Sequence, residues 1–412
     1  DAVGLYRLAK LTDQGHGVAQ DAYDASAMSR LAADWGNARA MATLGVCYEF
    51  GDGVPQDAVA AFAWYQASAS NGQTAGCWRL GQSYRLGIGT AIDLAEAARW
   101  FRKGANQGEI LCTNALGAMY KYGDGVPQDD LEATVWYEKA ALGGYYLAMV
   151  NLARCYLEGR GVDQDLSQAL AWLKRAADHH NSFAYLELAK LHDSDEWGMA
   201  DPALAIAWYR QAAEAGEIDA MFSLAYNLVH EATTPEAREE ARFWYTQASL
   251  AGDAMAMNNL ALMYLEAKPG EQDLAAGWRW MEKAAEAGNT LAMNNFCRSY
   301  QEGKSLPKDD ELAATWLMAA AEGGQVSCMY YLGLAYHDGQ GLAVNADQAR
   351  YWLEKATDSD HAEAAFALGC WYRDGDVLAQ DEALALRWFR LAAKLDHGDA
   401  MAEVGQALLF GN

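Results

Sequence analysis

Small and apolar residues recur along this chain at two intervals, four residues within a segment and 36 residues between segments. In one segment they are Ala40, Leu44 and Tyr48, and the small, large apolar and mostly Tyr positions return in the following segments. Residues four and eight positions apart lie on one face of a helix. The pattern therefore predicts a first helix in every segment, with a small residue that lets a second helix approach closely.

Glycine pairs such as Gly51 and Gly53 follow the first helix, and glycine supplies the positive φ that a helix end needs. A second helix is predicted after them, because a column of Asp residues stands where an N-cap belongs. These caps are Asp21, Asp57, Asp93, Asp129, Asp165, Asp201, Asp273, Asp309 and Asp381. The second helix mostly ends near another glycine, and His180 occupies that glycine position in one segment.

Each predicted second helix carries a Trp, and this Trp returns at every thirty-sixth residue. The column runs through Trp64, Trp100, Trp136, Trp172, Trp208, Trp244, Trp280, Trp316, Trp352 and Trp388. An aromatic ladder for ligands is one interpretation. Core packing between repeats is favoured, since the Trp stands at a fixed helical phase among Ala residues.

A fixed period of this size indicates a repeat architecture in which each unit completes its core against its neighbours. We therefore expect an all-α protein, an α-solenoid of about eleven and a half helix–turn–helix repeats. Residues 2–397 hold eleven repeats that form one continuous solenoid, and residues 398–412 form a terminal single helix.

The regular turn is lost in repeats 6 to 8. Other residues stand in the glycine places, namely Asp195, Trp197, Glu231, Thr233, Ala267 and Pro269. In repeat 7 the second helix is predicted to start three residues early, with Thr234 as cap and Pro235 at the first helical position. Local variation without consequence is one interpretation. A change of curvature, or an edge near residues 193–200 and 229–236 that contacts a partner, is the other.

The formal net charge is −25, which argues against duplex nucleic acid or an anionic membrane surface as a partner. No apolar stretch approaches the roughly 18 residues of a membrane span, so we expect no membrane insertion. The chain begins with Asp1 and enters the repeat pattern at once, so we expect a processed or trimmed chain whose targeting information is missing. We expect a monomer, although an oligomer is possible.

Seven Cys residues show no paired spacing, and we interpret them as small apolar residues inside helices. Unpaired thiols favour a reducing compartment such as the cytoplasm, while the periplasm or secretion stays open. Eight His residues are scattered over unrelated repeat positions, and no HExxH, GxSxG or P-loop motif is present. We therefore expect neither an enzyme nor a cofactor or metal site.

The segment from Gly45 to Gly72 resembles the Sel1-like repeats, which are related to the tetratricopeptide repeats. Its Gly-Asp-Gly-Val-Pro-Gln-Asp run at 51–57 returns at 123–129, and the resemblance extends over essentially the whole chain. The resemblance implies a right-handed superhelix of antiparallel helix pairs in which the first helices line the concave face. It also implies adaptor or scaffold functions with differing partners.

If the small, Leu and Tyr positions pack inward, the opposite stripe of each first helix faces the groove. The candidate partner-binding residues on this stripe are Trp78, Arg79, Arg85, Asn114, Lys121, Tyr122, Asn151, Arg154, Lys190, Tyr226, Asn258, Asn259, Asn294, Asn295, Arg298, Tyr330 and Tyr331. Asn can pair with both polar groups of an extended peptide backbone, and Arg can hold a carboxylate through two parallel hydrogen bonds. A solvated polar face without a ligand is the alternative.

These observations favour a non-catalytic scaffold or adaptor that binds a partner protein or an extended peptide in the concave groove. The alternative is an acidic surface that binds a basic partner in bacterial secretion, virulence or toxin immunity. Association with such a partner would slow steeply as salt rises.

Overall fold

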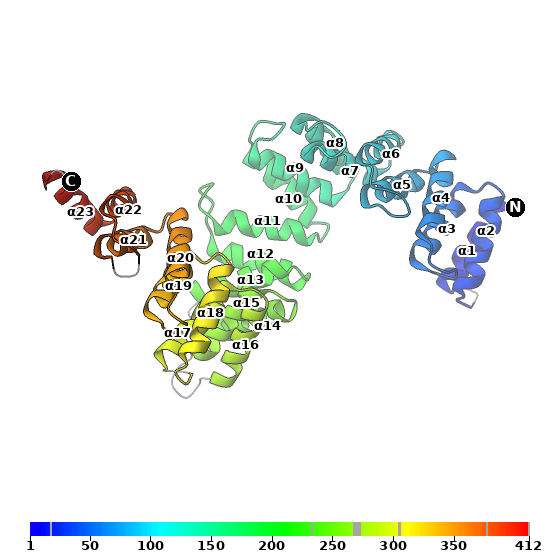
Figure 1. The fold of residues 1–412 in the computed structure, drawn as a ribbon. Coiled ribbons are helices and arrows are strands. Elements are labelled where there is room, and N and C mark those ends of the chain that lie inside the picture. Colours follow the sequence, from blue (N-terminus) through cyan, green and yellow to red (C-terminus); the bar gives the residue numbers. More distant parts are fainter. Residues whose placement is uncertain (17–18, 232–233, 267–272, 304–305, 376–377, 411–412) are drawn as a thin grey trace. The chain divides into compact units, whose positions relative to one another are not determined.

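The structure is a computed structural model that describes residues 1–16, 19–231, 234–266, 273–303, 306–375 and 378–410. Within these ranges every regular element is an α-helix, as Figure 1 shows. The first helices of the repeats are α1 (Ala2–Gln14), α3 (Ala38–Phe50), α5 (Thr74–Leu86), α7 (Ile110–Tyr122), α9 (Tyr146–Glu158), α11 (Ser182–Asp193), α13 (Ile218–His230), α15 (Ala254–Leu265), α17 (Thr290–Glu302), α19 (Val326–Asp338), α21 (Ala362–Asp374) and α23 (Gly398–Phe410).

The second helices alternate with the first helices along the chain. They are α2 (Ala22–Asp34), α4 (Ala58–Ser70), α6 (Leu94–Asn106), α8 (Asp130–Leu142), α10 (Leu166–Ala177), α12 (Pro202–Glu214), α14 (Pro235–Leu250), α16 (Leu274–Glu286), α18 (Asp310–Glu322), α20 (Ala346–Asp358) and α22 (Glu382–Lys394). The predicted helix–turn–helix repeat is confirmed, and α23 is the terminal single helix.

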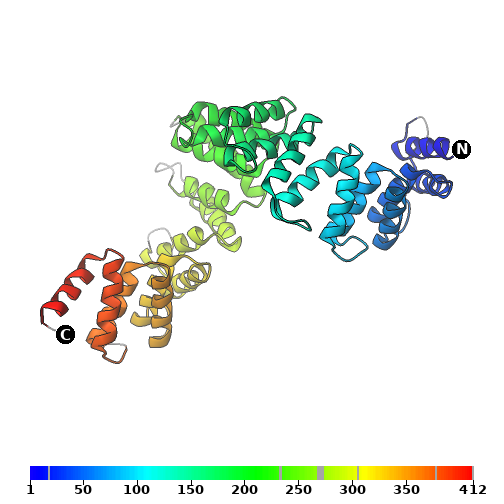
Figure 2. The same cartoon turned by 90° about the horizontal axis from the view of Figure 1, so that it is seen from above.

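The chain divides into two compact units, Asp1–Glu217 with α1 to α12 and Ile218–Asn412 with α13 to α23. Within each unit every helix packs against the next one in chain order, as Figure 2 shows. Each unit is therefore a stack of helix pairs, and the continuity of one solenoid through all repeats stays a prediction.

The core of each repeat consists of the small and Leu columns of the first helix and one aromatic or aliphatic residue of the second. Leu44, Leu80 and Leu116 have no solvent-exposed surface. The ring of Phe101 lies directly over Gly81, where a Cβ atom would come within 2.4 Å of the ring carbon Cε1. The small residue after each Leu therefore makes room for the side chain that follows the Trp column.

The Trp column packs against this core, but it lies at the edge of it. Trp352 is buried at 6% exposure, while the other nine Trp residues of the column are half-buried. Several carry a cation three residues later over the ring, as with Lys103 Nζ at 4.6 Å from the Trp100 centroid and Lys283 Nζ at 4.5 Å from that of Trp280. The fully buried position is the one after the Trp, held for example by Tyr65 and Leu173.

The predicted capping chemistry is confirmed throughout. All nine Asp residues of the cap column accept a hydrogen bond from a backbone N–H in the first turn of their second helix. Gly51, Gly87 and Gly123 end first helices in the left-handed conformation. His180 takes a φ of 56° in the glycine place that its position predicts.

Repeat 7 departs from the others as predicted. Helix α14 begins at Pro235, and the Thr234 side chain accepts a hydrogen bond from the Ala237 N–H. The predicted changes at Thr233, Ala267 and Pro269 lie outside the described residues. The early start adds a turn to α14 and places Arg238 in its first two turns.

Candidate functional site

Successive first helices of the first unit touch one another, as α3 with α5, α5 with α7 and α9 with α11, more extensively than any successive second helices do. The side of a curved stack on which the helices lie closer together is its inner side. The first helices therefore line the inner side of this unit, as the resemblance implies. We call the solvent-facing stripe of these helices the first-helix face.

On α5 the three candidate residues have different surroundings. Trp78 is half-buried, with its ring 5.4 Å from that of Phe101, so it belongs to the edge of the core. Arg79 Nη1 lies 3.6 Å from Glu49 Oε2 of the preceding first helix. Arg85 is exposed, and its Nε donates to Gln82 Oε1 at 2.7 Å.

Glu187 on α11 gathers two of the candidate cations. Arg154 Nη2 lies 2.9 Å from Glu187 Oε1, and Lys190 Nζ lies 3.7 Å from the same oxygen. The hydrogen bond to Glu187 raises the pKa of Arg154 above its ordinary value. Three of the five candidate cations of the first unit, Arg79, Arg154 and Lys190, are thus paired inside the molecule, which reduces their charge toward a ligand.

The candidate Asn residues bond mainly to one another. Asn151 Nδ2 donates to Asn114 Oδ1 at 3.2 Å between α9 and α7. In the second unit Asn295 Nδ2 donates to Asn258 Oδ1 at 3.3 Å, and Asn258 Nδ2 to Asn259 Oδ1 at 3.2 Å. The Asn151–Asn114 and Asn295–Asn258 bonds link neighbouring first helices.

The remaining candidates of the second unit lie near aromatic rings or acids. The Asn294 Oδ1 atom accepts from the Cys328 thiol at 3.5 Å, and Arg298 is exposed with its Nε 3.7 Å from Glu302. The Tyr330 ring lies 5.2 Å from that of Tyr331, and Tyr331 is exposed.

The ends of α3, α5 and α7 carry an exposed apolar row that sequence analysis found only in part. Phe50, Leu86 and Tyr122 occupy equivalent positions, 36 residues apart, and remain 60%, 55% and 66% exposed. We call these three side chains the apolar ridge. Lys121 and Arg85 precede two of its members, and Lys121 Nζ lies 5.3 Å from the Tyr122 centroid. Phe50 and Leu86 could have been identified from the sequence, because they stand at the same repeat position as the candidate residue Tyr122.

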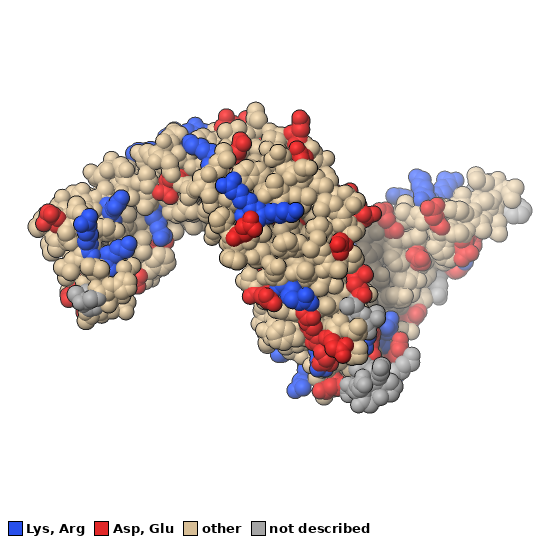
Figure 3. Space-filling model, turned by 180° about the vertical axis from the view of Figure 1, so that it is seen from behind, with Lys and Arg blue, Asp and Glu red and all other residues tan. Residues whose placement is uncertain are grey.

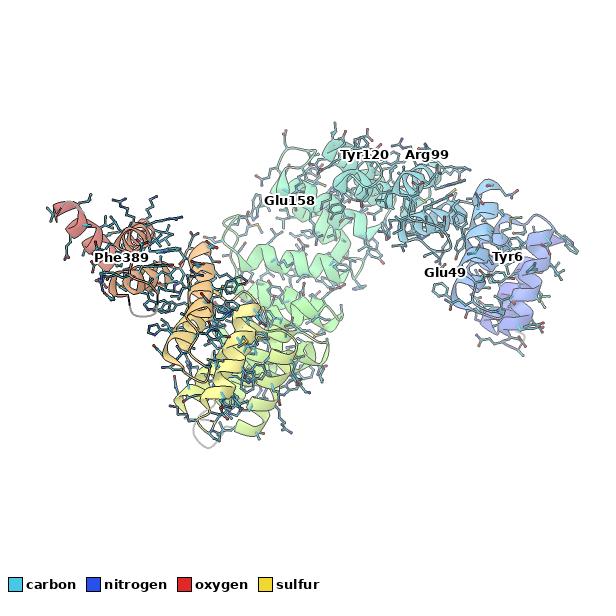
Figure 4. The ribbon with its side chains drawn as sticks, viewed as in Figure 1. Tyr6, Glu49, Arg99, Tyr120, Glu158 and Phe389 are labelled. Carbon is cyan, nitrogen blue, oxygen red and sulfur yellow. The ribbon has the colours of Figure 1, made fainter. Side chains whose placement is uncertain are left out.

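Two acidic residues, Glu49 on α3 and Glu158 on α9, stand at the two ends of the ridge in the repeat frame, and both are labelled in Figure 4. Glu49 accepts a hydrogen bond from the Tyr65 hydroxyl besides its ion pair with Arg79. Glu158 stands one repeat beyond Tyr122 and pairs with Arg160 at 2.9 Å. The apolar row therefore ends at α7, and an acidic residue follows on α9.

In the second unit a pocket of about 360 Å³ opens between α13, α14 and α15. The residues that line it are Tyr226, Val229, His230, Arg238, Tyr245, Asn259, Leu262, Met263 and Glu266. The rings of Tyr226 and His230 are stacked at 4.0 Å. Burial raises the pKa of Tyr245 to about 12, so its hydroxyl keeps its proton.

Basic and acidic side chains are interspersed on the face that Figure 3 shows. Within the described part of the chain no group of three or more His, Cys, Asp or Glu residues is placed to hold a metal ion. Nor does any helix of that part have the length and apolar character needed to cross a membrane.

The sequence model of the Sel1 repeat matches eleven segments, at residues 2–36, 38–73, 74–109, 111–145, 147–181, 182–217, 218–253, 254–289, 290–325, 326–361 and 362–397. No curated protein matches the chain. A solved structure of a protective antigen present in uropathogenic Escherichia coli strains, which displays an SLR fold, is 31% identical with a TM-score of 0.65. That match covers 98% of this chain and 86% of the antigen.

A Sel1 repeat protein from Oxalobacter formigenes is 28% identical with a TM-score of 0.62, and the match covers 76% of this chain and 90% of that one. These matches confirm the helical solenoid of 36-residue repeats that the spacing of small, Leu and Trp residues predicts.

Proposed function

The chain belongs to the Sel1 repeat family, and from that premise we propose that it is a non-catalytic scaffold that binds another protein, or an extended peptide segment of one, on its first-helix face. Sel1 repeats and related helical repeats generally mediate contacts between proteins. The proposal concerns which surface of this chain makes the contact and which side chains carry it.

The apolar ridge is the observation that carries the proposal. Large apolar side chains that stay exposed at equivalent places on three successive first helices form an apolar surface outside the buried core. Protein interfaces are enriched in aromatic residues at their centre, and a few such residues supply most of the binding free energy. Phe50, Leu86 and Tyr122 fit that description.

Cations beside the ridge give the partner a chemical preference. Arg85 and Lys121 form no ion pair with the described residues, in contrast to Arg79, Arg154 and Lys190. We therefore expect a partner segment that combines apolar side chains with a carboxylate. In the second unit the exposed side chains of Tyr226, Arg298 and Tyr331 present the equivalent face.

A photo-crosslinking experiment tests the surface. A photoreactive phenylalanine analogue replaces Leu86 in one variant and Leu131, an equally exposed leucine on the second helix α8, in another. Both variants are exposed to extract of the source cells, and the crosslinked proteins are identified by mass spectrometry. We expect a partner that crosslinks at position 86 and not at position 131.

The partner so found is then purified and titrated against variants of the ridge. The triple change of Phe50, Leu86 and Tyr122 to Ser should weaken binding at least about thirtyfold, which corresponds to roughly 2 kcal/mol. The matched change of Leu131 and Leu142 to Ser should leave the Kd within about twofold. Equal loss in both sets, or crosslinking at position 131 alone, contradicts the proposed surface.

A further inference from the structure

Three positions come together as a set between adjacent repeats. The set consists of the residue after the Trp in a second helix, a residue near the end of the first helix of the same repeat, and one on the next first helix. In repeat 2 these are Tyr65, Glu49 and Arg79, and their equivalents 180 residues later in repeat 7 are Tyr245, Val229 and Asn259. The repeats thus allow one site to be compared with another inside the same molecule.

A carboxylate completes the set where the chain supplies one. The Tyr65 hydroxyl donates to Glu49, which also pairs with Arg79 at 3.6 Å. In repeat 6 the Tyr209 hydroxyl donates to Asp193 Oδ2 at 2.9 Å. Where the chain places an acid at this position, the buried tyrosine hydroxyl takes it as its acceptor; in repeat 4, Lys121 stands there beside the buried Tyr137.

Repeat 7 keeps the tyrosine and lacks the acid. Val229 stands where Glu49 and Asp193 stand in the other repeats. The Tyr245 hydroxyl accepts a hydrogen bond from Asn259 Nδ2 at 3.1 Å, and its own hydrogen has no acceptor among the described residues. The pocket of about 360 Å³ lies at this place, and both Val229 and Tyr245 line it.

The same pocket also contains a basic residue, Arg238. Arg238 on α14 lines the pocket, at the repeat position where the other second helices begin, and it forms no ion pair with any residue that the structure describes. Glu266 also lines the pocket and forms no ion pair with Arg238. A hydroxyl donor and an unpaired guanidinium in one partly apolar pocket are the groups that bind a carboxylate.

We propose that this pocket binds a glutamate or aspartate side chain of a partner protein, whose carboxylate takes the place that Glu49 and Asp193 hold in repeats 2 and 6. The stacked rings of Tyr226 and His230, with Leu262 and Met263, contact the neighbouring residues of the bound segment. The inference rests on the proposed function for the kind of partner, while it concerns a separate surface in the second unit.

A peptide-retention experiment tests the proposal with the full chain. Two libraries of acetylated and amidated pentapeptides are used as probes, one with Glu fixed at the central position and one with Gln. The chain is immobilised, and the retained peptides are quantified by mass spectrometry. We expect the Glu library to be retained at least fivefold more than the Gln library.

Four variants assign that preference to the pocket. Tyr245→Phe removes only the hydroxyl, and Phe101 and Phe389 show that the fold accepts Phe at this position. Arg238→Gln changes an exposed residue and removes the cation. Val229→Glu places a carboxylate of the chain itself in the pocket. Each of these should abolish the preference for Glu, while the matched control Val229→Ala should keep it within about twofold.

The outcomes separate the two proposals. Equal retention of both libraries, or a preference for Glu that survives both Tyr245→Phe and Arg238→Gln, overturns the pocket assignment. A Gln library with a free terminal carboxylate, retained better than the Glu library, would assign the pocket to a chain end and overturn the acidic side chain. Phe50, Leu86 and Tyr122 belong to the other unit. Their variants therefore test partner binding at the apolar ridge independently of the peptide experiment.

Discussion

Arg154 on α9 holds Glu187 on α11 through a contact of 2.9 Å between Nη2 and Oε1. The pair joins two neighbouring first helices of the first unit, on the stripe where a ligand-binding arginine was expected. Its position raises the question of whether Arg154 stabilises the stack or binds a partner, and a pair of charge exchanges separates these roles.

Exchanging the two charges should preserve the stack. Arg154→Glu alone places two acids side by side, and we expect it to lower the free energy of unfolding by about 1 kcal/mol, because the pair is only partly buried. The double change Arg154→Glu with Glu187→Arg restores an ion pair between the two helices and should recover part of that loss, because Lys190 then faces a cation in place of Glu187. Urea unfolding followed by circular dichroism measures both.

The same variants give the answer for binding. If Arg154 serves the stack alone, the exchanged pair should bind the partner as the original chain does. A partner Kd that stays tenfold weaker in the exchanged pair, in spite of recovered stability, would assign Arg154 to the interface.

Glycine turns within and between repeats are expected to be sensitive to substitution for two separable reasons. Gly89 has φ +69°, and a Cβ there would lie 1.9 Å from the Ala58 carbonyl oxygen of the preceding repeat. Gly72 has φ +80°, but no atom lies within 4 Å of its Cβ position. Gly72→Ala should therefore cost about 1 kcal/mol for the backbone conformation alone, and Gly89→Ala about 2 kcal/mol more for the overlap.

Urea midpoints of the two alanine variants check this comparison. Equal midpoints would show that the turn moves away from α4 without cost, and that the close approach of the turn to the preceding repeat contributes nothing to stability.

The fold was predictable because its determinants are local and repeated. Asp129 caps α8 through chemistry that lies within three residues, and Thr234 with Pro235 starts α14 in the same way. A fixed period then places every such signal in a common frame. Errors of one or two residues, which obscure helix ends in irregular chains, cannot accumulate here.

The sequence predicts the candidate site only as a solvent-facing stripe of the first helices. The helical period places Arg79 and Arg154 on the solvent side, but their pairing with Glu49 and Glu187 depends on distances between helices of different repeats. The exposure of Phe50 and Leu86 depends equally on how far the next repeat reaches. Such distances follow from the packing of whole repeats against one another, so the sequence of one repeat does not predict them.

The N-cap of α14 should control the pocket as well as the helix. The Thr234 hydroxyl accepts the Ala237 N–H at 3.2 Å, and Thr234→Ala removes this cap at a cost of about 1 kcal/mol. The first turn of α14 should then open more often, and Arg238 should lose its fixed position at the pocket each time. Hydrogen exchange should accelerate at residues 237–241, while Asp165→Ala should accelerate exchange only at the start of α10.

Retention of Glu-centred peptides provides the second readout of that change. We expect the Thr234→Ala variant to retain less of the Glu-centred peptides than the original chain, and the Asp165→Ala variant to retain the same amount. Unchanged exchange over residues 237–241 would show that packing alone holds the first turn of α14.

Alkaline pH should destabilise the chain through its buried thiols, and Cys328 allows this to be isolated. Burial raises the pKa of the Cys328 thiol from 9.0 to about 11, and the thiol donates to Asn294 Oδ1 at 3.5 Å. In the unfolded chain the thiol ionises near pH 9, while in the folded chain it stays protonated. The folded state thus holds more protons between these values, and the free energy of unfolding falls as pH rises through that window.

Cys328→Ala removes this contribution with little change of shape, because Ala292 and Ala364 occupy the same column without exposure. We expect the variant to be slightly less stable than the original chain at pH 7, where the larger side chain fills its site. Between pH 9 and 11 the difference should shrink or reverse by about 1 to 2 kcal/mol, given about 1.4 kcal/mol for each unit of pKa shift. Unfolding curves that keep a constant separation from pH 7 to 11 would show that the thiol ionises equally well in the folded chain.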